Sequence, residues 1–297
     1  MRPGLTGELR ALVALAVPLA VGQLGMQLMG LVDTAMLGRF TKAALAGSGV
    51  ANGLMLPIAV LGMGIVMGLD TLIPQAVGAG NPARVRLLLA RGLRVAIVVG
   101  VPLSAIAALT PPILHLARVD PDITAAATIY LYWRLPGMIP MLLFAALRSY
   151  LQAHHITRPI VIAVIAGNVV NAIADAILIY GDGALSAVGL PAIGLPAFGV
   201  AGAAIASSCT MILACAIIAL AVRAHLRAQP RTGGLPETGP DPTADIFRLG
   251  VPVGLQLAAE VGLFALTGIL AGRLGKVPAA AHQVSLSLVS FTFSVAV

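Results

Sequence analysis

Long apolar runs separated by short polar segments dominate this chain. Eight runs reach the roughly 20 residues that a helix needs to cross the hydrocarbon core of a bilayer. They cover residues 11–38, 44–78, 93–115, 124–152, 159–181, 197–222, 248–272 and 279–297. We expect helices, because every backbone group buried in lipid must find a partner within its own segment. The alternation of single apolar and polar residues that is typical of a membrane barrel is absent. The pattern therefore predicts an all-α, polytopic transmembrane helical bundle.

The composition excludes most other classes of protein. The chain has 59% hydrophobic and 10% charged residues, and its mean hydropathy is +1.00, which leaves too little polar surface for a soluble globule of 297 residues. Its net charge of +7 comes from basic residues spread over the loops and not interleaved with aromatic residues, so we expect no nucleic-acid partner. Cys209 and Cys215 form no CxxC motif and are interpreted as packing residues. We expect no signal peptide, because the first run ends in Asp-Thr-Ala-Met-Leu-Gly and not in a small-residue cleavage site.

The basic residues of the loops predict the orientation of the chain. One side of the membrane carries Arg2, Arg10, Arg84, Arg86, Arg91, Arg94, Arg148, Arg158, Arg223, Arg227, Arg231 and Arg248. The other side carries Arg39, Lys42, Arg118, Arg273 and Lys276. Since cytoplasmic loops hold the excess of Lys and Arg, we expect a multi-pass protein of the inner (cytoplasmic) membrane with its N-terminus in the cytoplasm.

An internal repeat predicts two lobes. Residues 16–42 and 250–276 read as copies of one another, and each copy holds a proline, Pro18 or Pro252, at the same place. Each proline deletes a backbone hydrogen bond, so we expect both helices to bend there. Residues 224–246, rich in proline and glycine, are interpreted as a flexible linker.

We therefore assign residues 1–223 to an N-terminal six-helix lobe, 224–246 to a cytoplasmic linker and 247–297 to the first two helices of a second lobe. A second lobe that matches the first needs six helices, so we expect the sequence to be a fragment. Repeated lobes with coupling sites deep in the bilayer are typical of secondary transporters. Transport, not enzyme catalysis, is the leading hypothesis.

Acidic residues inside the apolar runs are the main candidates for chemistry. A charge at the centre of a lone membrane helix costs on the order of 2.5–3.5 kcal/mol, so such residues usually face a cavity or a partner. Asp33 and Asp175 both lie roughly 8–9 Å below the outer ends of their helices, so they can meet. Asn168 and Asn171 share the helix face of Asp175.

Two carboxylates held close in a poorly hydrated site cannot both ionise at low cost, so such a pair can take up and release a proton near neutral pH. The alternative is that these Asn and Asp side chains only join helices by hydrogen bonds.

Glu260 and Asp70 lead to different expectations. Glu260 lies roughly 18 Å from the outer end of its helix, close to the midplane. We interpret it as a cation or proton site, the alternative being a neutral buried side chain. Asp70 lies near the cytoplasmic end of its helix, where interfacial water can solvate it, and a structural role is favoured.

The first helix also carries a row of methionines. Met26, Met29 and Met36 share one face with Asp33, and flexible, polarizable methionine suits a surface that accepts ligands of varied shape. We assign these methionines, together with Gln23 and Gln256, to the lining of a substrate site, although plain packing is the alternative reading of such a row.

The histidines suggest no metal site. His154, His155 and His282 lack metal-like spacing with each other or with acids. We expect neither a metal site nor a cofactor.

Several motifs in order resemble the multidrug and toxic compound extrusion (MATE) family. They are Val32-Asp33-Thr34-Ala35-Met36-Leu37-Gly38, Asp70-Thr71-Leu72-Ile73-Pro74-Gln75-Ala76-Val77-Gly78, Leu147-Arg148-Ser149-Tyr150-Leu151-Gln152, Asn171 with Asp175, Gly199-Val200-Ala201-Gly202, Gly250-Val251-Pro252 with Glu260, and Ala280-Ala281-His282-Gln283. The resemblance implies twelve helices in two lobes that export amphipathic or cationic small molecules in exchange for H⁺ or Na⁺. We expect a monomer.

Site residues are also implied by the resemblance. Asp33 matches the acid of the family's first helix, Asn171 and Asp175 match a polar pair in the fifth, and Glu260 matches the acid that helps bind the coupling cation in NorM-like members. Many NorM-like members have Asn at the position of Asp175. We favour H⁺ coupling at Asp33 and Asp175 over Na⁺ coupling at Glu260.

Other functions remain as alternatives. Related transporters of the same superfamily flip lipid-linked sugars, and a truncated chain can be inactive. An intramembrane protease is disfavoured, because neither a Tyr-Asp with Gly-x-Gly-Asp nor a Gly-x-Ser-x-Gly sequence is present.

Overall fold

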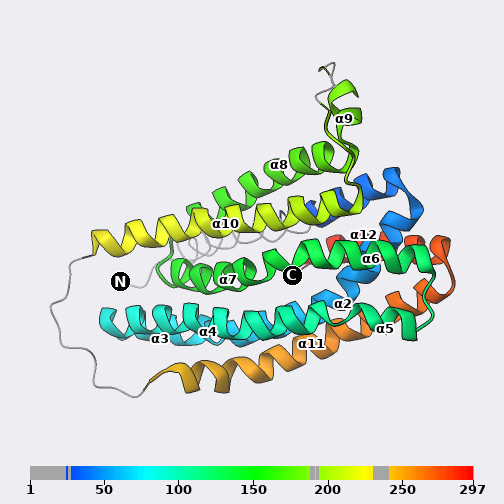
Figure 1. Ribbon diagram of the computed structural model, residues 1–297. Coiled ribbons are helices and arrows are strands. Elements are labelled where there is room, and N and C mark those ends of the chain that lie inside the picture. The colour runs from blue at the N-terminus through cyan, green and yellow to red at the C-terminus, as the bar shows by residue number, and fades with distance from the viewer. Residues whose placement is uncertain (1–24, 26–27, 188–190, 192–193, 230–240, 297) are drawn as a thin grey trace.

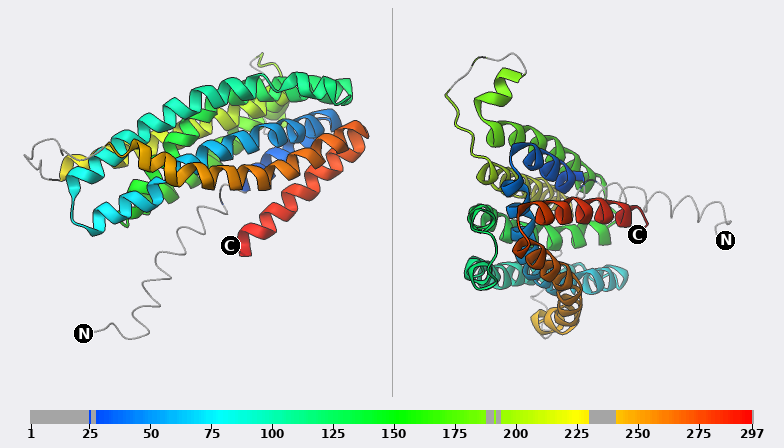
Figure 2. Two further views of the ribbon diagram at one scale, coloured as in Figure 1. Left: turned by 90° about the horizontal axis from the view of Figure 1, so that it is seen from below. Right: turned by 90° about the vertical axis from the view of Figure 1, so that its right-hand side faces the viewer.

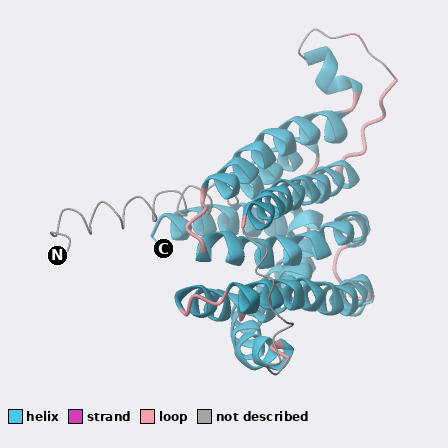
Figure 3. Cartoon of the chain, turned by 90° about the vertical axis from the view of Figure 1, so that its left-hand side faces the viewer, coloured by secondary structure: helices cyan, strands magenta, loops and turns pink. Residues whose placement is uncertain are grey.

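The computed structural model describes residues 25, 28–187, 191, 194–229 and 241–296. After a first helix whose described part covers 28–40, the elements are α2 (Lys42–Val66), α3 (Leu69–Gly78), α4 (Pro82–Ala108), α5 (Pro111–Leu116), α6 (Pro121–Arg134), the 3₁₀ turn η1 (Leu135–Gly137), α7 (Met138–Ala153), α8 (Arg158–Tyr180), α9 (Asp182–Ala187), α10 (Val200–Ala228), α11 (Thr243–Arg273) and α12 (Lys276–Ala296). The described residues contain helices and loops but no strand (Figure 3). This confirms the predicted all-α class.

Six described helical segments are long and apolar enough to cross a membrane. They are Lys42–Gly78, Pro82–Leu116, Pro121–Ala153, Arg158–Tyr180, Val200–Ala228 and Thr243–Arg273, and they coincide with the second to seventh predicted runs. The eighth predicted run coincides with α12, and the first lies only partly within the described residues.

Polar side chains at the N-cap positions set where several helices begin. The side chain of Thr41 accepts a hydrogen bond from the backbone N–H of Ala44 at 3.0 Å, which caps the start of α2. Asn81 caps α4 in the same way, accepting from the N–H of Arg84 at 2.9 Å. Asp120 caps α6 and is followed by a proline in the first helical position, where the missing N–H costs nothing.

Breaks within three of the crossing segments also follow the sequence. The α2–α3 segment breaks at Met67 and Gly68, and the α4–α5 segment breaks before Pro111. The α6–α7 segment passes through η1, which holds a proline and Gly137. Proline removes a backbone donor and glycine weakens a helix, so both favour a break at these positions.

The helices lie side by side along one axis (Figure 1). α8 packs on α10, α10 packs on α6 and α7, and α7 packs on α4, while α2 contacts α4, α6 and α7. The helix α9 projects from one end of the bundle (Figure 1). α11 runs along α2, and α12 folds back from the end of α11 (Figure 2). Large apolar side chains such as Val98 on α4 and Leu263 on α11 are exposed, as expected where helices face lipid.

The contact between α2 and α11 depends on glycines. A Cβ atom added at Gly250 would lie 2.0 Å from the carbonyl oxygen of Ile65, and one added at Gly64 would lie 2.2 Å from the Cα of Gly254. Such distances leave no room for any side chain. Gly250 and Gly254, four residues apart on α11, and Gly64 on α2 let the backbones approach closely, a common mode of membrane-helix packing.

Both ends of the predicted linker are helical. α10 extends to Ala228 and α11 begins at Thr243, so each helix enters the 224–246 segment. Ion pairs tie the start of α11 to α4: Arg91 Nη2 lies 3.2 Å from Asp241 Oδ2, and Arg84 Nη2 lies 3.8 Å from Asp245 Oδ2. The boundaries of the two lobes stay a prediction.

Candidate functional site

A buried polar cluster lies where the first helix meets α8 and α10. Asp33 is 8% exposed, and Asn171 and Asp175 are fully buried. The hydroxyl of Ser207, on α10, donates to Asp33 Oδ2 at 2.9 Å. We call Asp33, Asn171, Asp175 and Ser207 the acid cluster. The structure thus brings together three of the residues singled out from the sequence and adds a serine from a third helix.

Asn171 connects the two carboxyl groups. With its amide nitrogen turned toward them, Nδ2 lies 2.9 Å from Asp33 Oδ1 and 3.3 Å from Asp175 Oδ2. This orientation is the one that forms hydrogen bonds, because ionised carboxylates only accept. Asp175 Oδ1 is buried and has no partner among the described residues. A buried carboxyl oxygen without a donor is a place where a proton or a cation stabilises the site.

A cavity of about 230 Å³ opens beside the acid cluster. Its wall comprises parts of the first helix, α2, α6, α11 and α12, so it lies between the two predicted lobes. Polar side chains on that wall include Asp33, Asn52, Tyr130, His282 and Gln283. Asp33 therefore belongs to the acid cluster and also lines the cavity.

Further polar groups of the cavity come from both predicted lobes. The amide of Asn52 donates to the Tyr130 hydroxyl at 3.4 Å, and the hydroxyls of Thr34 and Ser287 lie 3.2 Å apart. His282 Nε2 is buried and has no partner among the described residues. Hydrogen-bonding groups with spare capacity on an otherwise apolar wall suit a small, partly polar guest.

The remaining residues of the first helix that were assigned to substrate lie elsewhere. Met29 lines a separate cavity of about 40 Å³. Met36 packs against the core, and its carbonyl oxygen accepts from the Tyr180 hydroxyl at 2.7 Å. Neither lines the larger cavity. Gln23, Met26 and Pro18 lie outside the described residues.

The predicted residues of α11 also lie apart from the acid cluster. Glu260 and Gln256 are exposed, and neither hydrogen-bonds to a described residue. Pro252 lies within α11, which continues through it from Thr243 to Arg273. In α11, the residues that do line the cavity are Val261, Phe264 and Gly268.

Two other expectations can be placed. Asp70 accepts a hydrogen bond from Ser149 Oγ, which joins α3 to α7, and its structural role stays a prediction. Asn168 shares the face of Asn171, but its amide donates to the carbonyl of Val164 in its own helix at 2.8 Å. No group of three potential metal ligands occurs among the described residues.

Three further polar residues, Ser207, Tyr130 and Arg134, were not predicted from the sequence. Ser207 begins the polar run Ser207-Ser208-Cys209-Thr210 inside a predicted membrane run, a signal that could have been used. Arg134 is an arginine inside another such run and lies half-buried beside Gly137 at the helix break. An ionisable residue within a membrane helix is a functional candidate by default.

A family model and curated relatives both match most or much of this chain. The family model MatE matches residues 18–177. The chain is 33% identical over 293 residues to "Probable multidrug resistance protein NorM" of Pseudomonas putida, covering 98% of this chain and 61% of that protein. It is 30% identical over 286 residues to "Multidrug resistance protein NorM" of Vibrio cholerae, covering 96% of this chain and 61% of that protein.

Solved structures support the fold. The eukaryotic MATE transporter AtDTX14 superposes with a TM-score of 0.74 at 19% identity, over 97% of this chain and 64% of that chain. An inward-facing MATE family transporter of the MOP superfamily gives a TM-score of 0.70 at 19% identity, over 96% of this chain and 64% of that chain. The chain spans about three fifths of the length of the curated relatives it matches.

Proposed function

The chain belongs to the MatE family, and from that premise we propose that it forms the first lobe and the start of the second lobe of a secondary active antiporter. The antiporter exports amphipathic or cationic small molecules across the cytoplasmic membrane in exchange for H⁺. The printed names of its relatives, multidrug resistance proteins, support export of drugs.

The acid cluster carries this proposal. Asp33 and Asp175 are buried carboxyl groups that share the amide of Asn171 as a donor. Two negative charges this close in a dry site are costly, so binding one proton stabilises the pair. No Lys or Arg forms an ion pair with either acid among the described residues. The proton is then the smallest cation that can neutralise the cluster.

Exchange follows from the position of Asp33 on the cavity wall. When Asp33 is ionised, its charge attracts a cationic guest in the cavity between the lobes. When the pair takes up a proton, that charge is reduced and the guest is held less strongly. Binding of proton and substrate is therefore mutually unfavourable, which is the coupling that an antiporter requires.

The first experiment measures accumulation of ethidium in cells that lack other drug exporters and express the complete protein. The parent should lower ethidium accumulation, and Asp33→Asn should return it to the level of the empty vector, because the variant can neither bind the proton nor attract the guest. Asp122→Asn, at an exposed helix start, removes one acid elsewhere and should leave export unchanged. Undiminished export by Asp33→Asn present in the membrane at parental level would contradict the role of Asp33.

The second experiment identifies the coupling ion. In proteoliposomes of the complete protein without Na⁺, an inside-acidic pH gradient should drive substrate uptake, since protons leave as substrate enters. Asp175→Asn should abolish this drive. Transport that needs a Na⁺ gradient and ignores the pH gradient would instead support Na⁺ coupling at Glu260. Movement of a lipid-linked sugar without ethidium export would support a flippase, and absence of both activities would contradict the proposed transport function.

A further inference from the structure

A second and larger cavity, of about 1010 Å³, lies between α4, α7 and α10. Three arginines line it, Arg86 from α4 and Arg223 and Arg227 from α10, and no Asp or Glu is among the described residues that do so. We call it the arginine pocket. It shares no lining residue with the cavity beside the acid cluster. Nothing in the proposed export mechanism uses it.

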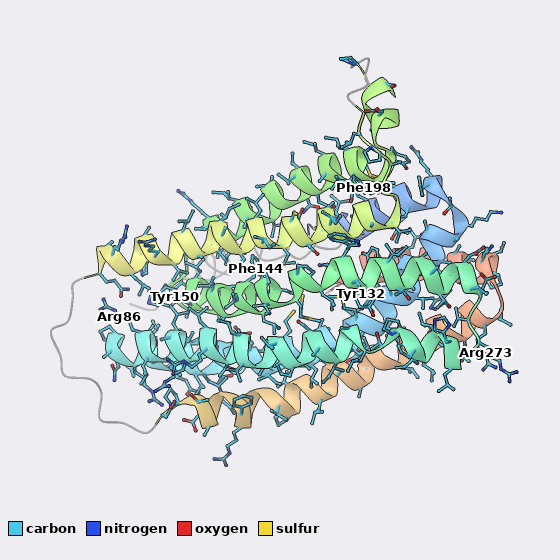
Figure 4. All side chains as sticks on the ribbon, viewed as in Figure 1. Arg86, Tyr132, Phe144, Tyr150, Phe198 and Arg273 are labelled. Carbon is cyan, nitrogen blue, oxygen red and sulfur yellow. The ribbon has the colours of Figure 1, made fainter. Side chains whose placement is uncertain are left out.

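The arginine pocket opens at the strongly basic end of the helices. Arg86 lies at this end and Arg273 at the opposite end (Figure 4). Arg223 and Arg227 are exposed and lie one turn apart in the last turns of α10, so they share one face of that helix. Because the excess of Arg lies at this end, the positive-inside rule puts the pocket at the cytoplasmic surface of the membrane.

The rest of the wall is apolar and leads away from the arginines. Leu89, Leu93 and Leu226 line the pocket itself. On α4 the same helix face continues from Leu93 to Ile97 and Val101, which are 47% and 54% exposed. On α10, Leu220, one turn before Arg223, is 65% exposed. The pocket is thus positively charged at its opening and apolar along the side that faces the membrane.

We propose that the arginine pocket binds an anionic phospholipid of the cytoplasmic leaflet, with the phosphate between the arginines and an acyl chain along α4 and α10. Guanidinium groups pair with phosphate through two parallel hydrogen bonds. Basic pockets between membrane helices on the cytoplasmic side suit anionic headgroups. A soluble phosphate would use the arginines but leave the apolar wall bare, and a zwitterionic lipid would fill the wall but bring no net negative charge.

The test titrates the purified full chain in detergent with phosphatidylglycerol or phosphatidylcholine and counts bound lipid by native mass spectrometry. We expect the parent to prefer phosphatidylglycerol. The double variant Arg223→Gln/Arg227→Gln should lose that preference by on the order of tenfold to thirtyfold, since each arginine near an anionic surface contributes separately. Arg223→Lys/Arg227→Lys keeps the charge and should retain most of the preference.

The matched control is Arg94→Gln/Arg158→Gln. Both arginines are exposed and belong to the same basic side but do not line the pocket, so removing them changes the net charge equally. This control should keep the preference within about twofold of the parent. Elution as one symmetric peak in size-exclusion chromatography checks that each variant is folded.

Three outcomes would overturn the proposal. One is equal retention of the two lipids by the parent. Another is equal loss of preference in the control and in Arg223→Gln/Arg227→Gln. The third is displacement of phosphatidylglycerol by inorganic phosphate at a similar concentration, which would make the pocket a soluble-phosphate site. None of these outcomes depends on drug export, so they leave the proposed function untouched.

Discussion

The two repeated hairpins of this chain have the same design but different surroundings. The first hairpin joins the helix of residues 28–40 to α2 through Thr41, and the second joins α11 to α12 through a similarly short turn. In the first, Asp33 is buried against α8 and α10. In the second, Glu260 is exposed and hydrogen-bonds to no described residue.

The two acids also occupy different positions along the aligned repeats. When Lys42 is aligned with Lys276, an offset of 234 residues, Asp33 falls opposite Thr267 and Glu260 falls opposite Met26. The two acids therefore lie about two helical turns apart in depth. This offset shows that the acids of the two hairpins do not occupy equivalent positions of the repeat.

The largest expected effect concerns the contact that holds the hairpins together. Gly250→Leu should destabilise the protein by about 3 kcal/mol or more, because the added side chain has to displace the backbone of α2 at Ile65. Thermal unfolding followed by size-exclusion chromatography measures the loss. Gly262→Leu, in the same helix but with open space around its Cβ position, should behave like the parent. Similar melting of both variants would show that α11 does not pack on α2 this closely.

The next effect concerns the link between the two carboxyl groups. Asn171→Leu should cost about 2–3 kcal/mol at neutral pH, because two buried carboxylates lose their shared donor. The loss should shrink as the pH is lowered, since a protonated carboxyl can donate to the other carboxylate. Asn168→Leu is the matched control, because that amide bonds only within its own helix. A pH-independent loss, equal in both variants, would mean that Asn171 serves packing alone.

These residues also show how far sequence could lead. Apolar runs predicted the helices and their order, and depth in the membrane predicted that Asp33 and Asp175 can meet, because both follow from local spacing. Periodicity tells which residues share a face but not which helix covers that face. For this reason Ser207, which is 174 positions from its partner Asp33, was overlooked.

The cavity wall illustrates the same limit within one helix. Asp33 shares a face with Met29 and Met36, but the cavity is lined by Gly30, Thr34 and their neighbours, a face rotated by about one residue. Both faces include Asp33. Which of the two faces lines the cavity depends on α11 and α12, which lie across it. The sequence of the first helix alone does not indicate this.

A smaller effect tests how the first helix is fastened at its outer end. Tyr180→Phe should lower the stability by about 1 kcal/mol, because it removes the hydroxyl that donates to the carbonyl of Met36. The aromatic contact between Tyr180 and Phe40 would remain. Thermal unfolding checks the change, and Tyr132→Phe, at an exposed position of α6, serves as the control. An unchanged melting temperature for Tyr180→Phe would show that the aromatic contact, and not the hydrogen bond, holds the first helix at this end.

The smallest effect compares the two lysines that occupy matched positions in the repeat. Lys276 forms an ion pair with Asp122 at the start of α6, and the hydrogen bond and charge of Asp122 raise the pKa of Lys276 above its usual value. A raised lysine pKa stabilises the fold at neutral pH, and that stabilisation is lost as the pH rises through the raised value. Both side chains are partly exposed, so Lys276→Gln should lower the melting temperature by only about 1–2 °C, and high salt should remove the difference. Lys42→Gln, whose side chain is exposed and pairs with no described acid, should leave the melting temperature unchanged. If Lys42→Gln proved the more damaging of the two, the first hairpin would hold an electrostatic contact that the second lacks, and the difference between their surroundings would extend to their outer ends.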